Sequence, residues 1–439
     1  MESIYWNPLI ETMPAQELKA LQLERFKKTF GNAFHNSKAY RQHYDNHGIT
    51  PKDIVTFEDI QKVPLIDKEF MSGTMDGSVY GSAIGVNEDQ VVHFHQTSGT
   101  TAKPLNQPDT LLDWCWWSEC WATVLWATGI RKGDRVMIAF GYGLFIGFWG
   151  AHYGCEKIGA EIISTGGLTS EQKIEKIRDL KVTAICATPT YIDRLTEAAN
   201  EMGVDVSTLG VKRIICAGEP GALIPAVKTR MESAWNCNVY DHIGATEVGA
   251  WGYECDHGSG GMHVHEGMFL AELMELNSEQ LITEPNIFGR VIITAFYRTG
   301  RPCVRFNTND IACWQDGYCS CGRTFRLFKG GIQGRADHIL KVRGTFVNPV
   351  IIEELIVGCA DLSREYALII QENGKDILLR VEAAQSIPSP DFESIRNKIW
   401  KIIYNKTYLN FHVEVMPFGT LVRSAAKSKR VIDLRKVVM

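Results

Sequence analysis

The stretch "VTAICATPTYIDRLTEAANEMGVDVSTLGVKRIICAG", residues 182–218, reads as a strand, a helix and a second strand. Short apolar runs form its two ends, and such runs are typical of fully buried strands. The alternation extends to both sides, with a strand expected at 134–140 and helices expected at 171–180 and 224–236. Strands that alternate with helices predict a parallel sheet with helices on its faces.

Ligands bind such a sheet at the carboxyl ends of its strands. The segment "AGEPG", residues 217–221, directly follows the second strand of the opening stretch. Its Gly and Pro residues are also typical of a plain turn. We expect a ligand site here because other motifs of the chain point to the same ligand.

The segments outside this region follow other patterns. Apolar residues at helical spacing predict an amphipathic helix over 15–34. After about residue 260 the chain turns to short strands separated by turns, among them 289–298 and 303–314, which indicates a β-rich subdomain. A βαβ unit is expected from "YALIIQENGKDILLRVEAA", residues 366–384, and the helix that follows it.

A domain boundary is expected near Arg335 to His338. The predicted domains are therefore residues 1–336 and 337–439. The predicted fold class is α/β, with a large N-terminal domain of parallel α/β sheets plus a β-rich subdomain, and a small α+β C-terminal domain.

The totals are those of an ordinary globular protein of 439 residues, with 45% hydrophobic residues and a net charge of −5. This charge argues against a dedicated nucleic-acid binder, whose surface would be basic. No secretory signal precedes the first helix, so the twelve cysteines are expected to be free thiols and the protein cytoplasmic. Residues 136–155 carry no Asp, Glu, Lys or Arg, but five glycines favour a buried strand, a turn and a packed helix over a membrane span.

A polar loop stands at "HFHQTSGTTAKPLNQ", residues 93–107. Small residues let backbone N–H groups approach a ligand, hydroxyls donate hydrogen bonds, and Lys103 adds a charge. Such a loop can wrap phosphate, although it lacks the Walker A spacing. A polar turn between two strands is the alternative.

Six motifs in this order resemble the adenylate-forming (ANL) superfamily, and within it the phenylacetate–coenzyme A ligase group. They are "TSGTTAKP" (97–104), "AGEPG" (217–221), "YDHIGATE" (240–247), "NTND" (307–310), "GRADHILKVRG" (334–344) and "RSAAKSKRVID" (423–433). The opening "YWNPLIETMPAQELKALQLERF", the stretch "GYGLFIGFWGAHYG" and the pair "CSCGR" point to that group in particular.

The resemblance implies ATP-dependent activation of an aryl or arylacetic acid to an acyl adenylate, then transfer to coenzyme A, with AMP and pyrophosphate released. It implies a mobile C-terminal domain that rotates between the two steps, with Asp337 at the hinge. One alternative is a different acceptor, as in coenzyme F390 synthetase-like relatives. A non-catalytic nucleotide-binding relative is another, but Lys103, Glu247, Asp310 and Lys427 together count against it. The sequence does not fix the oligomeric state, for which a homodimer is one option.

The chemistry of carboxylate activation explains three of these residues. Attack on the α-phosphate crowds negative charge, which cations and N–H donors must stabilise. Glu247 suits Mg²⁺, a hard cation that prefers carboxylate and phosphate oxygens. Asp310 suits the ribose hydroxyls, and Lys427 could reach the α-phosphate. Taken singly, Glu247 and Asp310 are more typical of solvated loop acids, and Lys427 is typical of a basic tail.

The resemblance assigns a larger set of residues. Thr246 joins Lys427 and Glu247 as catalytic. The expected nucleotide contacts are Thr97, Ser98, Gly99, Thr100, Thr101, Lys103, Gly218, Glu219, Pro220, Asp241, His242, Ile243, Gly244, Asp310 and Arg335.

An apolar, aromatic pocket is expected for the acid. The resemblance places Tyr142, Phe145, Phe148, Gly244 and Ala245 in its wall. Ordinary core packing is the alternative for each ring. Phe148 stands where the group usually has a smaller residue, so the acid is left open.

A metal site is expected from Cys255, His263, Cys319 and Cys321, since three thiols and an imidazole suit a tetrahedral zinc ion. Four protein ligands leave no open position, so such a zinc would be structural. His257 and His265 compete as the nitrogen ligand, and Cys303 or Cys313 as a thiol. Reduced, unliganded surface cysteines are the other interpretation.

Overall fold

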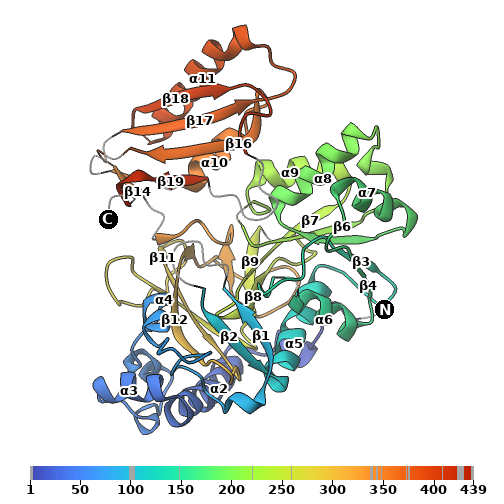
Figure 1. Cartoon of the computed structure of the whole chain (residues 1–439). Coiled ribbons are helices and arrows are strands. Elements are labelled where there is room, and N and C mark those ends of the chain that lie inside the picture. Colours follow the sequence, from blue (N-terminus) through green and yellow to red (C-terminus); the bar gives the residue numbers. More distant parts are fainter. Residues whose placement is uncertain are drawn as a thin grey trace.

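The computed structural model describes residues 3–97, 104–147, 149–219, 221–258, 260–336, 340–342, 345–347, 349–371, 373, 376–407, 409–422 and 430–436. An eight-stranded sheet in the order β13-β9-β8-β7-β6-β5-β3-β4 forms the centre of the large N-terminal part (Figure 1). Its strands are β3 (Arg135–Ile138), β4 (Glu161–Ser164), β5 (Ala184–Ala187), β6 (Arg213–Ala217), β7 (Asn238–Ala245), β8 (Gly249–Tyr253), β9 (Gly261–Val264) and β13 (Leu327–Lys329).

Five neighbouring strands of this sheet, from β4 to β7, run parallel. The helices between them are α6 (Trp149–Ile158), α7 (Ser170–Asp179), α8 (Pro189–Glu201) and α9 (Pro225–Trp235). The predicted alternation of strands and helices is therefore confirmed. Side-chain capping boxes or N-caps begin α7 at Thr169 and α8 at Thr188, which explains where these helices start.

Alternate residues of the parallel strands face two different cores. Ile185 and Ile214 pack against α7, α8 and α9, while Cys186 and Ile215 pack against the helices of the other face. That other face is covered by α6 and by α5 (Leu111–Ala127). The sheet is thus buried on both sides, which is why its strands are apolar without alternation.

At β7 the sheet changes direction, because β8, β9 and β13 continue it antiparallel. A second sheet in the order β10-β11-β12 packs beside this half. Its strands are β10 (Phe269–Met274), β11 (Phe288–Ala295) and β12 (Cys303–Cys313). They form the predicted β-rich subdomain. The sequence analysis named the strands that correspond to β11 and β12 but not β10.

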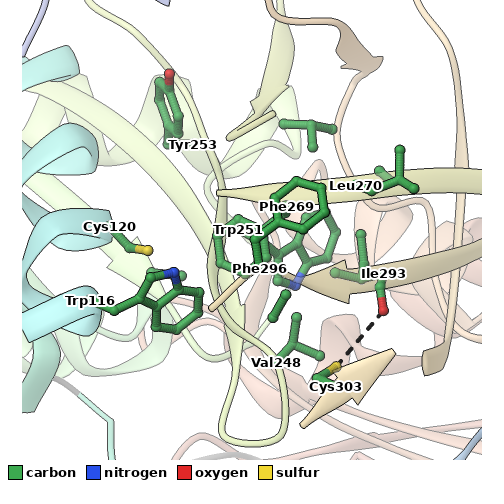
Figure 2. Close-up of a cluster of buried hydrophobic side chains, with 14 of the residues drawn as sticks. Trp116, Cys120, Val248, Trp251, Tyr253, Phe269, Leu270, Ile293, Phe296 and Cys303 are labelled. Carbon is green, nitrogen blue, oxygen red and sulfur yellow. Dashed lines mark hydrogen bonds between the residues drawn. The ribbon is translucent and has the colours of Figure 1, made fainter. Parts of the chain in front are cut away.

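One core joins the two sheets. Figure 2 shows Trp116 of α5, Trp251 of β8 and Phe269 of β10 converging with Val248. The rings of Trp116 and Phe269 lie 5.2 Å apart between centroids. The remaining N-terminal elements pack around this core: α1 (Pro8–Glu11), α2 (Ala15–Asn36), α3 (Lys38–Asn46), α4 (Lys68–Gly73) and the hairpin of β1 (Val91–Gln96) with β2 (Asn106–Thr110).

The C-terminal part has its own sheet and its own core (Figure 1). The sheet order is β18-β17-β16-β19, and two short strands and two helices complete the unit. The elements are β14 (Leu340–Val342), β15 (Thr345–Val347), α10 (Pro349–Val357), β16 (Leu362–Ile370), β17 (Ile377–Ala383), α11 (Phe392–Thr407), β18 (Phe411–Met416) and β19 (Val431–Asp433).

The βαβ unit expected from 366–384 needs a correction. β16 and β17 form an antiparallel hairpin, and the βαβ unit is β17-α11-β18, one element later. The turn "QENGKD" contains Asn-Gly, a hairpin signal that explains the difference. The predicted boundary between 336 and 337 stays a prediction, since 337–339 lie outside the described residues.

Residues 136–155 form the predicted buried strand, glycine-rich connection and packed helix. Across the part of the chain that the structure describes, no helix combines the length and the apolar character that crossing a bilayer requires.

Close packing of α6 on α5 depends on Gly150 and Gly154, both of which lie against Trp121. A Cβ at Gly154 would lie 2.7 Å from Cβ of Trp121 and 3.0 Å from its backbone carbon. We expect Gly154→Ala to lower the free energy of unfolding by about 1–3 kcal/mol, because the backbone of α5 must shift. Gly31→Ala in α2 is the matched control, since a Cβ there meets nothing within 4 Å. Urea unfolding measures both variants, and equal stabilities would contradict the packing argument.

Candidate active site and metal centre

The carboxyl edge of the parallel strands gathers several of the predicted residues. Ala217, at the end of β6, pairs with His242 of β7, so Gly218 and Glu219 lie beside Ile243 and Gly244. Gly218 has a φ of 93°, a left-handed conformation that favours glycine. Ligands bind open α/β sheets in the crevice outside the carboxyl ends of the strands, which is where these residues lie.

Glu219 has a local structural task. Its carboxylate accepts a 2.8 Å hydrogen bond from the backbone N–H of Thr190, in the first turn of α8. A carboxylate at this end of a helix satisfies a free N–H and favours the helix dipole. Glu219 therefore holds the loop after β6 against α8, while Pro220 lies outside the described residues.

Gly244 leaves an opening near the end of β7. It is exposed, whereas His242 is 4% exposed and packs on Trp121, with ring centroids 4.2 Å apart. A Cβ at Gly244 would lie 2.8 Å from the carbonyl oxygen of Gly249. The glycine therefore keeps β7 and β8 close and leaves its backbone accessible, with Ile243 and Ala245 half-buried on either side.

Thr246 and Glu247 follow β7 directly, and both are buried. Oε1 of Glu247 has no hydrogen bond within the described part of the chain. It lies 3.3 Å from Nζ of Lys68, whose side chain is 57% exposed. A buried carboxylate oxygen that can accept further contacts, beside an exposed ammonium, is suited to charged ligands.

Lys68 was missed by the sequence analysis. Ile66 forms a parallel bridge with Phe306 of β12, and Asp67 caps α4 by accepting from the N–H of Phe70. These contacts bring Lys68 to Glu247 from 179 positions earlier in the chain, and no motif around "IDKEF" signals it.

Asp310 and Arg335, both expected at the nucleotide, lie together. Nη1 of Arg335 is 3.4 Å from Oδ1 of Asp310, and the two residues form a backbone bridge. Nη1 also donates to the carbonyl of Thr308 at 3.2 Å. The carboxylate of Asp310, in the second half of β12, is therefore held by Arg335 and is partly exposed.

The polar loop is described only at its bases. The backbone N–H of Thr97 donates to the carbonyl of Leu105, and the N–H of Leu105 donates to Oγ1 of Thr97 at 3.0 Å. The hairpin thus closes the connection between β1 and β2 at these two residues. Ser98, Gly99, Thr100, Thr101 and Lys103 lie outside the described residues, as do Phe148, Asp337 and Lys427.

The expected acid wall contains a polar contact. The hydroxyl of Tyr142 lies 3.0 Å from Nδ1 of His152 and 3.2 Å from Oγ of Ser164. Its ring meets Trp149 edge-on at 4.6 Å between centroids. Half-buried Phe145 lies in the same loop, which Gln96 fixes by donating to the carbonyl of Leu144. Sequence reasoning missed His152, because a histidine inside a helix gives no motif.

Asp241, on the neighbouring strand β7, positions the loop after β6. Its two carboxylate oxygens accept from the N–H groups of His242 and Leu223. Oε2 of Glu254 accepts from the N–H of Asp241 at 2.7 Å, and Lys228 pairs with Glu254 at 2.9 Å. Burial, and then the charge of Glu254, raise the pKa of Asp241 well above its ordinary value. Asp241 therefore serves the shape of the edge as well as any ligand.

This pKa predicts a pH dependence of stability. The folded state holds the proton on Asp241 to higher pH than the unfolded chain does. The free energy of unfolding should therefore fall as the pH rises from about 4 through the folded-state pKa. Asp241→Asn cannot ionise, so it should lose less stability than the wild type between pH 5 and pH 8. Urea unfolding at the two pH values measures this, with exposed Asp205→Asn as control; parallel losses in wild type and Asp241→Asn would refute the assignment.

The four predicted metal ligands form one buried cluster. Cys255, His263, Cys319 and Cys321 place their ligand atoms within 4.8 Å of one another, and all are at most 5% exposed. Sγ of Cys255 lies 3.6 Å from Sγ of Cys319, and Sγ of Cys321 lies 3.5 Å from Nε2 of His263. A tetrahedral ion with bonds of about 2.3 Å to sulfur gives edges of about 3.8 Å. The cluster therefore has the dimensions of a tetrahedral metal site.

The surroundings of the cluster also fit a metal. Nδ1 of His263 lies 3.4 Å from the carbonyl of Phe325, which leaves Nε2 facing the thiols. Backbone N–H groups of Cys321 and Arg323 donate to sulfur atoms of Cys319 and Cys321. Hydrogen bonds from Cys255 and His263 lower the pKa of the Cys321 thiol, which favours the thiolate that a metal needs.

The other residues considered as ligands lie outside this cluster. The Sγ of Cys303 contacts the carbonyl of Ile293, and His265 lies among Tyr253, Phe269 and Phe325 (the contact of Cys303 is drawn in Figure 2). His257 and Cys313 are not in the cluster. The interpretation as surface cysteines was wrong, because the turn after β12 folds inward under Tyr5, whose hydroxyl donates to the carbonyl of Cys321.

Comparison with known proteins gives two family matches. Residues 54–266 match the model of the AMP-binding enzymes, and residues 344–435 match the model of the AMP-binding enzyme C-terminal domain. A phenylacetate-coenzyme A ligase of Pseudomonas putida is 30% identical over 436 residues, which cover 97% of this chain and 96% of that protein.

Solved structures of 2-hydroxyisobutyryl-CoA ligase match the whole chain at 27% identity. The post-adenylation state in complex with 2-HIB-AMP has a TM-score of 0.94, covering 99% of this chain and 94% of that one. The thioesterification state in complex with 2-HIB-AMP and CoA has a TM-score of 0.75, covering 98% and 92%.

Proposed function

Because the chain belongs to the family of the phenylacetate–coenzyme A ligases, which are AMP-binding enzymes, we propose that it joins an aryl carboxylic acid to coenzyme A at the expense of ATP. The observation that carries this proposal is the buried oxygen of Glu247 at the carboxyl edge of the parallel sheet, for which the described residues supply no hydrogen bond. It lies in a chain that matches such ligases from end to end.

The reaction has two displacements. The acid carboxylate attacks the α-phosphorus of ATP, and pyrophosphate leaves. The coenzyme A thiol then loses its proton, its sulfur attacks the acyl carbon, and AMP leaves. The first step crowds negative charge on the phosphates, so the protein must supply cations and N–H donors.

Glu247 would hold Mg²⁺, since its free oxygen suits a hard cation that binds phosphate oxygens as well. Mg²⁺ would offset phosphate charge when bound. Lys68, paired with Glu247 through an exposed ammonium, would then turn to the phosphates. Thr97 to Lys103 would hold the pyrophosphate, with Thr246 near the α-phosphate.

The nucleoside would lie along the carboxyl edge of the parallel strands. Gly218, Glu219, Pro220 and the segment Asp241 to Gly244 would frame the adenine, where the exposed backbone of Gly244 supports close approach. Asp310, fixed by Arg335, would accept hydrogen bonds from the ribose hydroxyls. The acid would lie against Tyr142, Phe145, Phe148 and Ala245.

The test of the function is ATP–pyrophosphate exchange with a panel of acids, followed by thioester formation with coenzyme A. Phenylacetate and benzoate represent aryl acids. 2-Hydroxyisobutyrate is included because the Tyr142–His152–Ser164 contact offers hydroxyl partners in the same wall. Exchange with an aryl acid and subsequent thioester formation support the proposal. The proposal is contradicted if none of the acids supports exchange, or if exchange occurs without subsequent thioester formation.

Lys427 is proposed as the cation at the α-phosphate, on a domain that turns at Asp337. We expect Lys427→Ala to lower acyl-adenylate formation by roughly two to three orders of magnitude, as for other lost transition-state partners. Thioester formation from supplied acyl adenylate should change far less. Lys401→Ala, an exposed lysine on α11 of the same unit, is the control. An equal loss in both half-reactions would remove Lys427 from this role.

The buried cluster of three cysteines and one histidine is proposed to hold a structural zinc ion. Elemental analysis of protein purified without a nickel column should give about one zinc per chain. Cys319→Ser should lose the zinc and melt at lower temperature, because metal binding and folding are coupled. Cys303→Ser, a buried thiol outside the cluster, should keep it. Metal-free wild type with full stability would overturn the assignment.

A further inference from the structure

The two parts of the chain meet through a carboxylate of the N-terminal part. Asp193 on α8 forms an ion pair with Arg364 on β16, and its other oxygen accepts from Nη2 of Arg230 on α9 at 3.2 Å. The side chains of Asp193 and Arg364 are 20% and 15% exposed. Val357 at the end of α10 packs on the N-terminal core beside these charges. Figure 1 shows this contact region where β16 and α10 approach α8 and α9.

Arg364 is a largely buried cation at the boundary between the two parts. Burial, and then the positive charge of Arg430, lower the pKa of Arg364 to about 9. A buried cation costs free energy unless a partner of opposite charge faces it. Asp193 faces Arg364 from across the boundary between the two parts, and Glu365 adds a second negative charge from the same strand as Arg364.

The same strand anchors the tail that carries Lys427. Nη1 of Arg430 donates to the carbonyl of Arg364 at 2.6 Å, and the N–H of Leu368 donates to the carbonyl of Arg430 at 2.7 Å. β19 then pairs in parallel with β16. Arg430 is three residues beyond Lys427. The contact of Asp193 with Arg364 therefore fixes the strand against which this tail begins.

The arrangement described here matches one state of the solved relative better than the other. The TM-score is 0.94 with its post-adenylation state and 0.75 with its thioesterification state. Since the sequence identity is 27% in both comparisons, the two scores differ through the relative's arrangement.

We infer that Asp193 and Arg364 are positioning residues for adenylation, forming an interdomain ion pair that holds the C-terminal part in the post-adenylation arrangement and opens when that part moves. This inference rests on the proposed function, because it assigns the pair to one of the two half-reactions. Arg230 keeps Asp193 in place on the N-terminal side when the pair opens.

The variants are Asp193→Asn and Arg364→Gln, alone and together, with Asp193→Glu as the charge-preserving variant. Each single neutral variant should lower ATP–pyrophosphate exchange roughly tenfold, as for close charge pairs across other interfaces. Thioester formation from supplied phenylacetyl adenylate should be unchanged or faster. The double variant should be no worse than either single variant, because the pair is lost once. Asp193→Glu should restore most of the exchange.

Arg380→Gln is the matched control. It breaks a 2.7 Å ion pair with Glu414 that lies within the C-terminal sheet and does not cross between the parts. Both half-reactions should keep wild-type rates in this variant. Equal losses in both half-reactions for Asp193→Asn, additive losses in the double variant, or no loss at all would overturn the inference.

A measurement without substrates separates this inference from the proposed function. Hydrogen–deuterium exchange of the unliganded protein should be faster over 190–194, 362–366 and 430–433 in Asp193→Asn than in wild type or Arg380→Gln. Unchanged exchange there overturns the ion pair as a positioning contact. A wild type that activates no acid would instead refute the proposed function, while the deuterium result still decides whether the pair holds the two parts together.

Discussion

The turn beyond β7 is the constraint on which the site depends. Val248 is fully buried in the core shared by the two sheets, directly after Glu247. Gly249 has a φ of 137°, and a Cβ there would meet Trp116 at 2.4 Å and Phe269 at 2.8 Å. The tight junction reverses the chain from parallel to antiparallel and turns the carboxylate of Glu247 to the edge. Because protein cores are close-packed, that orientation is held by both sheets at once.

Buried charges fall into two groups. Arg305 makes a two-armed contact with Glu272, and Arg323 pairs with Glu11 at 2.7 Å, so these pairs are satisfied within the fold. Glu247 is buried as well, yet among the described residues one of its oxygens has no hydrogen bond and pairs with Lys68 at 3.3 Å. An unsatisfied buried charge costs free energy in the empty protein and becomes favourable when a ligand of opposite charge arrives. Glu247 therefore keeps a capacity for a ligand that the two hydrogen-bonded pairs lack.

Two kinds of connection join the segments of the chain. The buried cluster of cysteines and histidine connects the end of β8 to the turn after β12, and all four of its side chains are buried. The contact between α8 and β16 is smaller and built on charges around Asp193. Ion pairs at a partly exposed boundary are modest in strength, so they can hold one arrangement and still open. The buried cluster joins elements within the N-terminal part, whereas the polar contact at the boundary between the two parts permits rearrangement.

The sequence by itself determined the local elements and the order of the motifs. Apolar runs and their spacing were enough to predict the parallel strands and their helices, because each element depends on neighbours within a few residues. The cluster of Cys255, His263, Cys319 and Cys321 was likewise predicted from the sequence, because few residue types bind zinc.

Only the tertiary structure decided which distant residues meet. The contact of Lys68 with Glu247, of Tyr142 with His152, and of Asp193 with Arg364 join residues whose flanking sequences carry no signal for one another. It also placed the hairpin of β16 and β17 before the βαβ unit, and it chose His263 over His265 as the nitrogen beside the thiols. The physical reason is that such contacts are set by how sheets and helices pack across the whole chain, a property that no short stretch of sequence contains.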